Sequence, residues 1–323
     1  MRLRNLRQLE HFVAVVEAGT IGRAAQRIHL SQAALSKSIQ QLEEELGVEL
    51  FHRGPRGMEP TVFGECVANY TLRIRAELAR AREELANLKG QKLGHVSVGG
   101  GPSFIRAIFP NAVARFHQRV PEASVTVHEG MAESLMAGLL NGTLDLAVGA
   151  RVNTALTEEL SRQELFQYRA VLVAGKNHPF MRMENVTLQD LSKALWILPA
   201  YPDTLRQHIA KVFLDADLDP PKPFAESNSV SFMTQLLAQV PAVSLLPESL
   251  LNTVNAREHL AIVPAPECTW ERTAYVYTRR SVKPSPLARL LLAEIQNVVA
   301  EMVQSDQING RLASDLSLTA KTG

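Results

Sequence analysis

Residues 20–47 read TIGRAAQRIHLSQAALSKSIQQLEEELG, and this stretch decides the fold of the N-terminal part of the chain. Apolar residues repeat at helical spacing twice within it, first at Ile21, Ala24, Ala25 and Ile28, and then at Leu35, Ile39, Leu42 and Leu46. Each run follows a residue that accepts hydrogen bonds at a helix start, namely Thr20 and Ser31. The sequence therefore predicts two short helices joined by a tight turn.

The outer face of the second helix is polar near its start. It carries Gln32, Ser36, Lys37 and Gln40. Amide and hydroxyl groups read base edges in a major groove, and a lysine binds guanine or a phosphate. Two short helices with such a leading end are typical of a helix-turn-helix whose second helix enters the groove. An ordinary helical hairpin with a solvated face is the alternative.

The flanking residues favour DNA binding. Upstream, a first helix that ends at Gly19 has one apolar side, made of Leu6, Leu9, Phe12, Val13 and Val16. Downstream, ELFHRGPRGMEPT at 49–61 places Arg53 and Arg56 around a glycine–proline turn. A short hairpin tipped with arginines suits a wing that lies along the phosphate backbone.

These residues together resemble a known family. Residues 6–65, LRQLEHFVAVVEAGTIGRAAQRIHLSQAALSKSIQQLEEELGVELFHRGPRGMEPTVFGE, are similar to the winged helix-turn-helix of LysR-type transcriptional regulators. The resemblance implies bacterial transcriptional control by a DNA-bound oligomer, with Gln32, Ala33, Ser36 and Lys37 at the bases. The chain departs from the family pattern at Ala33, usually proline, and at Lys37, usually arginine. The second change removes a bidentate donor, so operator contacts are expected to differ in detail.

Composition agrees with an intracellular regulator. The 323 residues carry a net charge of +1, and 46% of them are hydrophobic, which is enough for two or three domains with real cores. Cys66 and Cys268 lie far apart without a pairing pattern, which favours a reducing compartment. Arg2, Arg4 and Arg7 precede no apolar signal region, and no apolar run is long enough to span a membrane. We therefore expect a cytoplasmic protein without a membrane partner.

One long helix is predicted from Thr61 to about Lys89. Its apolar seam consists of Phe63, Val67, Tyr70, Ile74, Leu78, Ala81, Leu85 and Leu88. A long helix with one narrow apolar stripe usually pairs with a copy of itself. Packing onto the chain's own N-terminal domain is the alternative. Gly90 and Gly94 end this helix and form a hinge.

Beyond the hinge, strands and helices alternate. Strands are predicted at 95–98, 124–129, 145–149, 170–173, 196–198, 243–246 and 275–277, and helices at 104–120, 131–140, 205–215, 231–239 and 287–302. This alternation predicts parallel sheets covered by helices on both faces. We interpret the region as two α/β lobes joined by two crossovers, near Glu164 and near Cys268. The arrangement resembles periplasmic binding proteins and the effector domain of LysR-type regulators.

The expected domains follow from these elements. A winged helix-turn-helix occupies 1–62, a linker and dimerisation helix 61–92, and an effector-binding domain 93–303. Within the last, lobe I comprises 93–164 and 269–303, and lobe II comprises 165–268. Residues 304–323 are polar and aperiodic and are expected to be a disordered tail. The fold class is α/β, combining the N-terminal winged helix-turn-helix, the long helix and a two-lobed, periplasmic-binding-protein-like domain.

Ligands of open α/β lobes bind beyond the carboxyl ends of the strands. That rule selects candidate effector-binding residues at Pro102, Ser103, Gly149, Arg151, Tyr201, Asn228, Ser229, Ser231, Phe232 and Pro247. Ser103 and Ser229 are expected to face a bound carboxylate, Arg151 to pair with it, and Tyr201 or Phe232 to form an apolar wall. Each has a structural alternative, because these serines can be plain helix caps and Arg151 a surface charge.

Enzymatic motifs are missing from the sequence. GGGPSF at 99–104 lacks dinucleotide-binding spacing, and no Walker, H-E-x-x-H or G-x-S-x-G motif occurs. The nine histidines are scattered without metal-ligand spacing, so we expect no catalytic residue, metal or cofactor. The alternatives are a helix-turn-helix fused to an enzyme, which turnover of a metabolite would reveal, and an exported solute-binding module, which secretion would reveal.

The sequence thus predicts a ligand-responsive transcriptional regulator. Its expected partners are double-stranded operator DNA, a small organic effector such as an organic or aromatic acid, and further copies of itself. We expect a dimer through the long helix and a tetramer as the assembly, with RNA polymerase as a further candidate partner.

Overall fold

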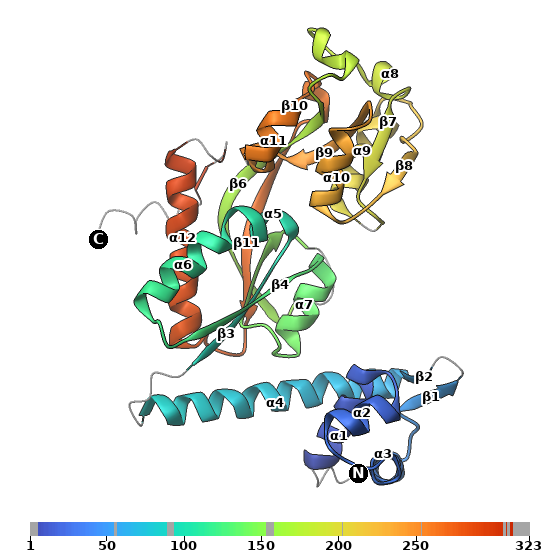
Figure 1. The fold of residues 1–323 in the computed structure, drawn as a ribbon, viewed down its shortest axis with the longest axis vertical. Coiled ribbons are helices and arrows are strands. Elements are labelled where there is room, and N and C mark those ends of the chain that lie inside the picture. The colour runs from blue at the N-terminus through green and yellow to red at the C-terminus, as the bar shows by residue number, and fades with distance from the viewer. Residues whose placement is uncertain are drawn as a thin grey trace. The chain divides into compact units, whose positions relative to one another are not determined.

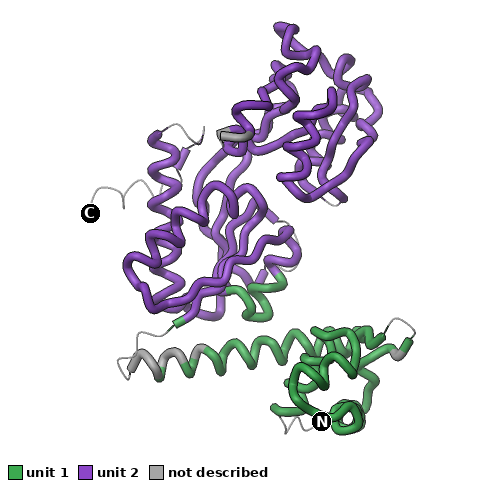
Figure 2. The backbone as a smooth tube through the Cα atoms, viewed as in Figure 1, with its two compact units in different colours: residues 1–94, 137–144 green, residues 95–136, 145–323 purple. Residues whose placement is uncertain are grey.

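The computed structural model describes residues 6–54, 57–88, 94–152, 158–201, 203–252, 254–305, 308 and 311–312. The chain forms two compact units, one of residues 1–94 and 137–144 and the other of residues 95–136 and 145–323 (Figure 2). Each unit is built around its own apolar core. They are described separately below.

The first unit begins with three helices, α1 (Leu6–Ala18), α2 (Ile21–Arg27) and α3 (Gln32–Leu46) (Figure 1). Thr20 and Ser31 cap α2 and α3, because their hydroxyls accept the backbone N–H groups of Arg23 and Ala34. Gly47, in the left-handed conformation, ends α3. Except for Leu6, which is exposed, the predicted apolar residues of the three helices share one core, which includes Phe12, Leu35, Ile39 and Leu42.

A two-stranded hairpin follows α3. β1 (Phe51–Gly54) pairs antiparallel with β2 (Gly57–Pro60). The N–H of Met58 donates to the carbonyl of Gly19, 2.9 Å away, which ties the hairpin to the turn between α1 and α2. A side chain at Gly57 would place its Cβ 2.5 Å from that same oxygen, and φ is +113° there, so the position requires glycine.

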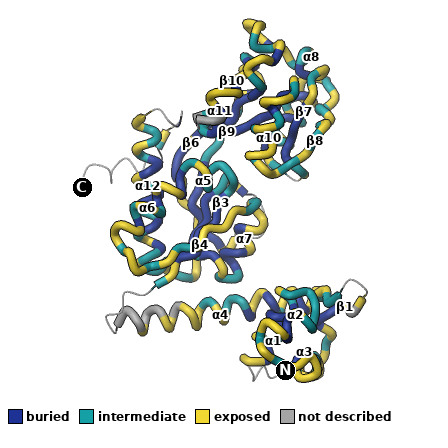
Figure 3. The backbone as a smooth tube through the Cα atoms, viewed as in Figure 1, coloured by how far each residue is buried: buried dark blue, intermediate teal, exposed yellow. Residues whose placement is uncertain are grey.

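The long helix α4 spans Val62–Leu88. Thr61 caps it by accepting the N–H of Gly64 at 3.1 Å. Ala68 and Thr71 of α4 are buried, and Ala68 packs on the core of the three helices. The opposite face is exposed (Figure 3), with Phe63, Tyr70, Ile74, Leu78 and Leu85 all more than 40% accessible. The helix therefore packs through one side and leaves most of its apolar seam uncovered in the single chain.

The second unit contains one mixed sheet of nine described strands. They are β3 (His95–Gly100), β4 (Ser124–Glu129), β5 (Leu146–Ala150), β6 (Leu160–Gly175), β7 (Leu195–Leu198), β8 (Pro223–Glu226), β9 (Ala242–Pro247), β10 (Leu260–Ile262) and β11 (Trp270–Arg279). The spatial order is β4-β3-β5-β11-β6-β9-β7-β8, with β10 beside β6. Below, lobe I denotes the part around β3, β4 and β5, and lobe II the part around β7, β8 and β9.

The prediction of purely parallel sheets is wrong at the centre of the molecule. β3 is parallel to β4 and β5, and β7 is parallel to β8 and β9, as the alternating pattern implies. However, β11 runs antiparallel to β5 and β6, and β6 runs antiparallel to β9. The reason is that β6 and β11 are the two connections between the lobes and pass through in opposite directions, side by side (Figure 1).

Helices flank these strands. They are α5 (Pro102–Ala107), α6 (Phe109–Arg119), α7 (Ala132–Leu140), α8 (Leu188–Leu191), α9 (Thr204–Asp215), α10 (Val230–Leu237), α11 (Val254–His259) and α12 (Pro286–Gln304), with short 3-10 helices η2 (Pro179–Arg182), η3 (Glu248–Asn252) and η4 (Pro266–Cys268). The single helix predicted over 104–120 is two helices that meet at Ile108. Pro110, which lacks an N–H and clashes with the preceding turn, explains the break.

The expected disordered tail is packed at the residues that the structure describes. Ile308 is buried in the core of lobe I, and Leu312 forms a β-bridge with Phe166 of β6. The carbonyl of Arg311 accepts the N–H of Gln167 at 2.8 Å. These two apolar side chains, four positions apart in a polar segment, account for the contact. Residues 313–323 of the predicted tail lie outside the described residues.

Candidate functional site

The polar face of α3 is accessible in the first unit. Gln32, Ala33, Lys37 and Gln40 are exposed and Ser36 is half-buried. Leu35, Ile39 and Leu42 point the other way and are at most 1% accessible. The helix is thus anchored by its apolar side and presents the predicted base-reading residues on a continuous outer surface.

Two contacts fix the position of α3. His11 of α1 and Ser38 of α3 form a hydrogen bond of 2.8 Å between Nδ1 and Oγ. Burial lowers the pKa of His11, which favours its neutral form at pH 7. At the start of α3, the amide of Gln32 lies over Gly22, where an added Cβ would be 3.1 Å from Nε2. A glycine at position 22 therefore gives Gln32 room beside α2.

The hairpin carries the predicted phosphate contacts. Arg53 lies on β1, opposite Met58 in the strand pairing. The side chain of Arg53 and the whole of Arg56 lie outside the described residues. The hairpin itself is fastened at Gly19, so its two strands have a defined place beside the helices.

A cleft of about 570 Å³ lies between the lobes of the second unit. Seven of the ten candidate effector residues line it, namely Pro102, Ser103, Gly149, Arg151, Tyr201, Asn228 and Pro247. The first turns of α5, α7, α9 and α10 also reach it, through Ser103, Glu133, Thr204 and Val230. Backbone N–H groups at helix starts favour negative charge, so the cleft suits an anionic ligand.

Ser103 is available to a ligand in lobe I. It is the second residue of α5, whose N-cap is Gly101, and that cap has no side-chain hydrogen bond. Ser103 is therefore not the cap of α5, which was the structural alternative for this residue. Nearby, the Tyr277 hydroxyl donates to the carbonyl of Ala150 and accepts the N–H of Val152, which holds the loop that carries Arg151.

The predicted residues of lobe II divide into two groups. Tyr201, 71% exposed, lines the cleft, and so does Asn228, whose side-chain oxygen accepts the N–H of Ala200 at 3.0 Å. Ser229, Ser231 and Phe232 are not among the residues that line the cleft. Ser229 caps α10 by accepting the N–H of Phe232 at 3.3 Å. It therefore has the capping role that was the alternative to ligand binding.

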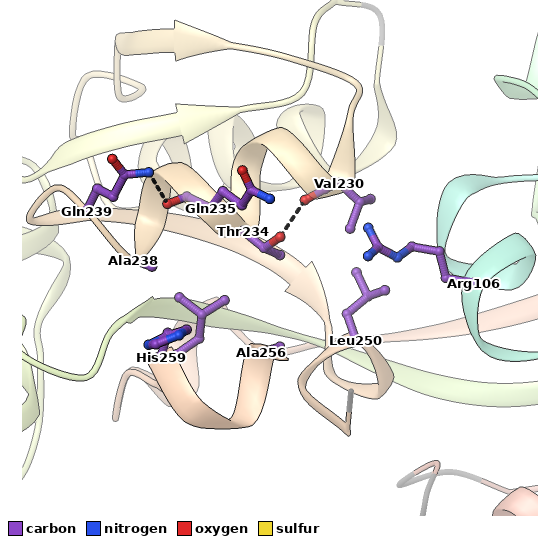
Figure 4. A pocket seen from close by; sticks show the side chains of 10 residues that line it. Arg106, Val230, Thr234, Gln235, Ala238, Gln239, Leu250, Ala256 and His259 are labelled. Atoms are coloured by element: carbon purple, nitrogen blue, oxygen red, sulfur yellow. Dashed lines mark hydrogen bonds between the residues drawn. The ribbon is translucent and has the colours of Figure 1, made fainter. Parts of the chain in front are cut away.

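Ser231 is engaged by the opposite lobe. Arg106 of α5 donates a hydrogen bond to its hydroxyl. Arg106 also lines a second pocket of about 400 Å³, to which α10 and α11 contribute half of the lining residues. Figure 4 shows the guanidinium reaching toward Val230 and Leu250, with His259 farther along the same pocket. This contact joins the lobes beside the cleft.

Sequence reasoning missed two cleft residues on the crossover strands. Tyr168 of β6 and Arg272 of β11 are paired in the sheet and both line the cleft. The crossover near Cys268 was predicted, and the run that follows it, Trp270 to Tyr277, is rich in aromatic and β-branched residues, which favours a longer strand. Extending the predicted strand to Trp270 places Arg272 at the lobe boundary.

No grouping of three or more metal-binding side chains occurs among the described residues. Nor do the described helices include one that is long and apolar enough to cross a membrane. Cys268 is buried, which raises the pKa of its thiol to about 12, so this cysteine is not a reactive nucleophile at pH 7.

Comparison with known proteins finds two family matches. Residues 6–65 match the bacterial regulatory helix-turn-helix of the lysR family, and residues 89–300 match the LysR substrate binding domain. The uncharacterized HTH-type transcriptional regulator YdcI of Escherichia coli (strain K12) is 31% identical over 81% of this chain and 85% of its own length. The regulator GbpR of Azospirillum brasilense is 27% identical over 90% of this chain and 85% of its own.

A solved structure shares the fold. Full-length CbnR in complex with its target DNA superimposes with a TM-score of 0.64 at 22% identity, over 91% of this chain and all of that one. At this identity the likeness concerns the fold alone.

Proposed function

The chain belongs to the LysR family of bacterial transcriptional regulators, and we propose that it binds operator DNA as a homo-oligomer and responds to a small organic acid held between its two C-terminal lobes. Members of this family are regulators of transcription rather than enzymes. They bind DNA and small-molecule effectors. The proposal concerns which surfaces of this chain carry those two roles and how they communicate.

The DNA-binding role is assigned to α3 and the hairpin. The exposed, mostly uncharged face of α3 fits the major groove, where Gln32 and Ser36 would meet base edges and Lys37 a guanine or a phosphate. Ala33 and Gln40 extend the same face. Arg53 and Arg56 of the hairpin would contact phosphates and set the register along the duplex.

The assembly is assigned to α4. Its apolar seam is uncovered over several turns in the single chain, and a seam of this length is buried most simply by a second copy of the same helix. A dimer places two α3 helices on one DNA molecule, which matches the two half-sites of a palindromic operator. Pairing of two dimers gives the proposed tetramer, and RNA polymerase is the proposed downstream partner.

The effector role is assigned to the interlobe cleft, without a cofactor. Within the described residues the Ser103 hydroxyl forms no hydrogen bond, and the starts of α5 and α7 offer N–H groups to an anion, whereas those of α9 and α10 are capped by Asp203 and Ser229. A ligand that touches both lobes binds one interlobe angle better than another and shifts the equilibrium toward it. That angle governs how dimers pair, and hence the spacing of the DNA-binding heads.

The observation that carries this proposal is the presence, in one chain, of an exposed polar recognition face and a two-lobed cleft lined from both sides. Two measurements with the full-length protein test it. Selection from random double-stranded DNA should enrich one palindromic sequence, and a thermal-shift screen of small acids should find ligands that raise the melting temperature. Failure to enrich any sequence would overturn the DNA-binding assignment.

A further inference from the structure

We propose that Arg272 is the residue that fixes the acidic group of the effector, so that the ligand is a small monocarboxylic acid with an apolar body. This inference rests on the proposed function of the cleft as the effector site. It assigns the recognition of the acid to a residue on a crossover strand and not to Arg151, the cation expected from the sequence.

Arg272 occupies the boundary between the two cores of the second unit. It pairs in the sheet with Tyr168, which belongs to the core of lobe I, while the next inward-facing residue of β6, Ala170, belongs to the core of lobe II. Trp270, two residues before Arg272, packs on the core of lobe II. A ligand bound to Arg272 therefore lies at the strands that connect the two lobes.

The guanidinium of Arg272 is held in place by its neighbours. Its central carbon lies 4.7 Å from the ring centre of Trp270 and 5.7 Å from that of Tyr168. One terminal nitrogen donates to the hydroxyl of Thr204, the first residue of α9, over 2.7 Å. Because a stacked, planar group loses little further freedom on binding, this arrangement favours a carboxylate that matches its fork of donors.

Arg272 retains donors for a ligand. Two other arginines of the same unit are neutralised by glutamates, Arg169 by Glu248 at 3.0 Å and Arg206 by Glu226 at 2.9 Å. Within the part of the chain that the structure describes, Arg272 forms no such ion pair, and its one side-chain hydrogen bond uses one of five N–H donors.

One acidic residue of the cleft, Asp203, is engaged by a helix start. Its Oδ1 accepts the N–H groups of Leu205 and Arg206 at the start of α9. That cap keeps the carboxylate directed at the helix. Neither Asp203 nor Glu133, the other carboxylate that lines the cleft, forms an ion pair with Arg272 among the described residues.

Burial distinguishes Arg272 from Arg151. Arg272 is half-buried on a strand, whereas Arg151 is exposed on the loop after β5. An ion pair in a partly dehydrated position is screened less by solvent and salt. The buried side chains of Leu205, Met233 and Leu246 also line the cleft, and these apolar groups suit the body of the acid.

The competing explanation is that Arg272 only braces the aromatic rings and α9. The affinity for ligands distinguishes this explanation from the proposal. The experiment measures the affinity of the full-length protein for matched probes, phenylacetate and hexanoate against phenylacetamide and hexanamide, by calorimetry. In the wild type both acids should bind more tightly than their amides, because only the acids form a charged pair with a guanidinium.

Arg272→Met keeps an apolar stem on the rings and removes the charge. It should weaken both acids about tenfold or more and leave the amides unchanged, while Arg272→Lys, which keeps the charge without the fork, should fall between. The matched control is Arg162→Met, since Arg162 makes the same kind of contact, 5.4 Å from the ring of Tyr275, and does not line the cleft.

The outcomes separate this inference from the function on which it rests. If Arg272→Met and the wild type bind the acids equally, or if no acid binds the wild type, the inference is overturned, whatever operator binding shows. If the acids bind through Arg272 but no operator can be selected, the inference stands and the regulatory function fails. The melting temperature of each variant without ligand shows whether the contacts of Arg272 with the aromatic rings and α9 have been lost. If Arg272→Met is destabilised, the affinity of Arg272→Lys for the acids decides between the two explanations.

Discussion

Nη1 of Arg106 lies 2.5 Å from the hydroxyl oxygen of Ser231, so a side chain of α5 in lobe I is hydrogen-bonded to the first turn of α10 in lobe II. The bond is exposed and lies beside the interlobe cleft. A polar contact between the lobes favours the interlobe angle at which it forms. It therefore belongs to the set of interactions that an effector must strengthen or break.

This contact predicts a measurable coupling. Arg106→Ala and Ser231→Ala should each lower the free energy of unfolding by no more than about 1 kcal/mol, and the double variant should be no less stable than either single one, because all three lack the same bond. Chemical denaturation monitored by circular dichroism checks this. Fully additive losses would mean that the two side chains act independently.

The recognition face predicts a loss of sequence discrimination. Gln32→Ala and Ser36→Ala should each reduce the preference for the selected operator over scrambled DNA by roughly 1–3 kcal/mol, measured by fluorescence anisotropy. Arg53→Ala should weaken both DNAs alike and flatten the salt dependence, because phosphate contacts carry no sequence information. Glu44→Gln, at the far end of α3, is the control. Equal losses on both DNAs for Gln32→Ala would place the reading face elsewhere.

The uncovered seam of α4 predicts a change of assembly. Ile74→Asp or Leu78→Asp would bury a charge between paired helices, and the dimer should dissociate in sedimentation experiments, with loss of operator affinity. Asn69→Asp adds the same charge to an exposed position of α4 away from the seam and should leave the assembly intact. An unchanged oligomer with Ile74→Asp would show that copies associate through other surfaces.

Two serines predicted alike from the sequence should behave differently. Ser103→Ala should weaken effector binding by roughly 1.5–3 kcal/mol if its hydroxyl meets a carboxylate, with little effect on stability. Ser229→Ala should instead lower the free energy of unfolding by about 1 kcal/mol, since it removes the cap of α10, and leave effector affinity nearly unchanged. Isothermal calorimetry and urea unfolding of both variants decide. A large loss of ligand affinity with Ser229→Ala would contradict the assignment of Ser229 to a capping role.

His208 predicts a pH dependence of stability. Burial, and then the charges of Arg272 and Lys211, lower its pKa below the ordinary value of 6.5. Below that value the unfolded chain binds a proton that the folded protein does not, so the free energy of unfolding should decrease as the pH falls through 6.5 and level off below the lowered pKa. The pKa values of His11 and His178 are lowered in the same direction.

The variant His208→Phe isolates the contribution of His208 to the pH dependence of stability. A phenyl ring preserves the stacking on Trp270, where the ring centres are 4.3 Å apart, and removes the titrating group. The decrease in stability between pH about 7.5 and about 5.5 should be smaller in this variant. Asp190 and Glu301 do not confuse the comparison, because their pKa values are lowered from 3.8 and 4.5 and they stay charged in this range.

The amino-acid sequence by itself determined the parts of the protein that depend on neighbouring residues. Thr20 and Ser31 cap the helices that follow them, and Leu35, Ile39 and Leu42 face the core, as the spacing predicts. These features follow from one helical turn and from hydrogen bonds across three residues. For the same reason the polar face of α3 was recognisable without any knowledge of the rest of the fold.

Only the tertiary structure decided which side chains line the cleft and what else they contact. Ser103 and Ser229 look equivalent in sequence, yet Ser103 lines the cleft with a hydroxyl that forms no hydrogen bond among the described residues, whereas Ser229 caps α10 and is not one of the lining residues. Arg272 and Tyr168 become neighbours because β6 and β11 pair as antiparallel crossovers. Periodicity reports which side of an element is apolar, whereas the partner of a strand depends on contacts between residues far apart in the chain, and these form only when the lobes pack.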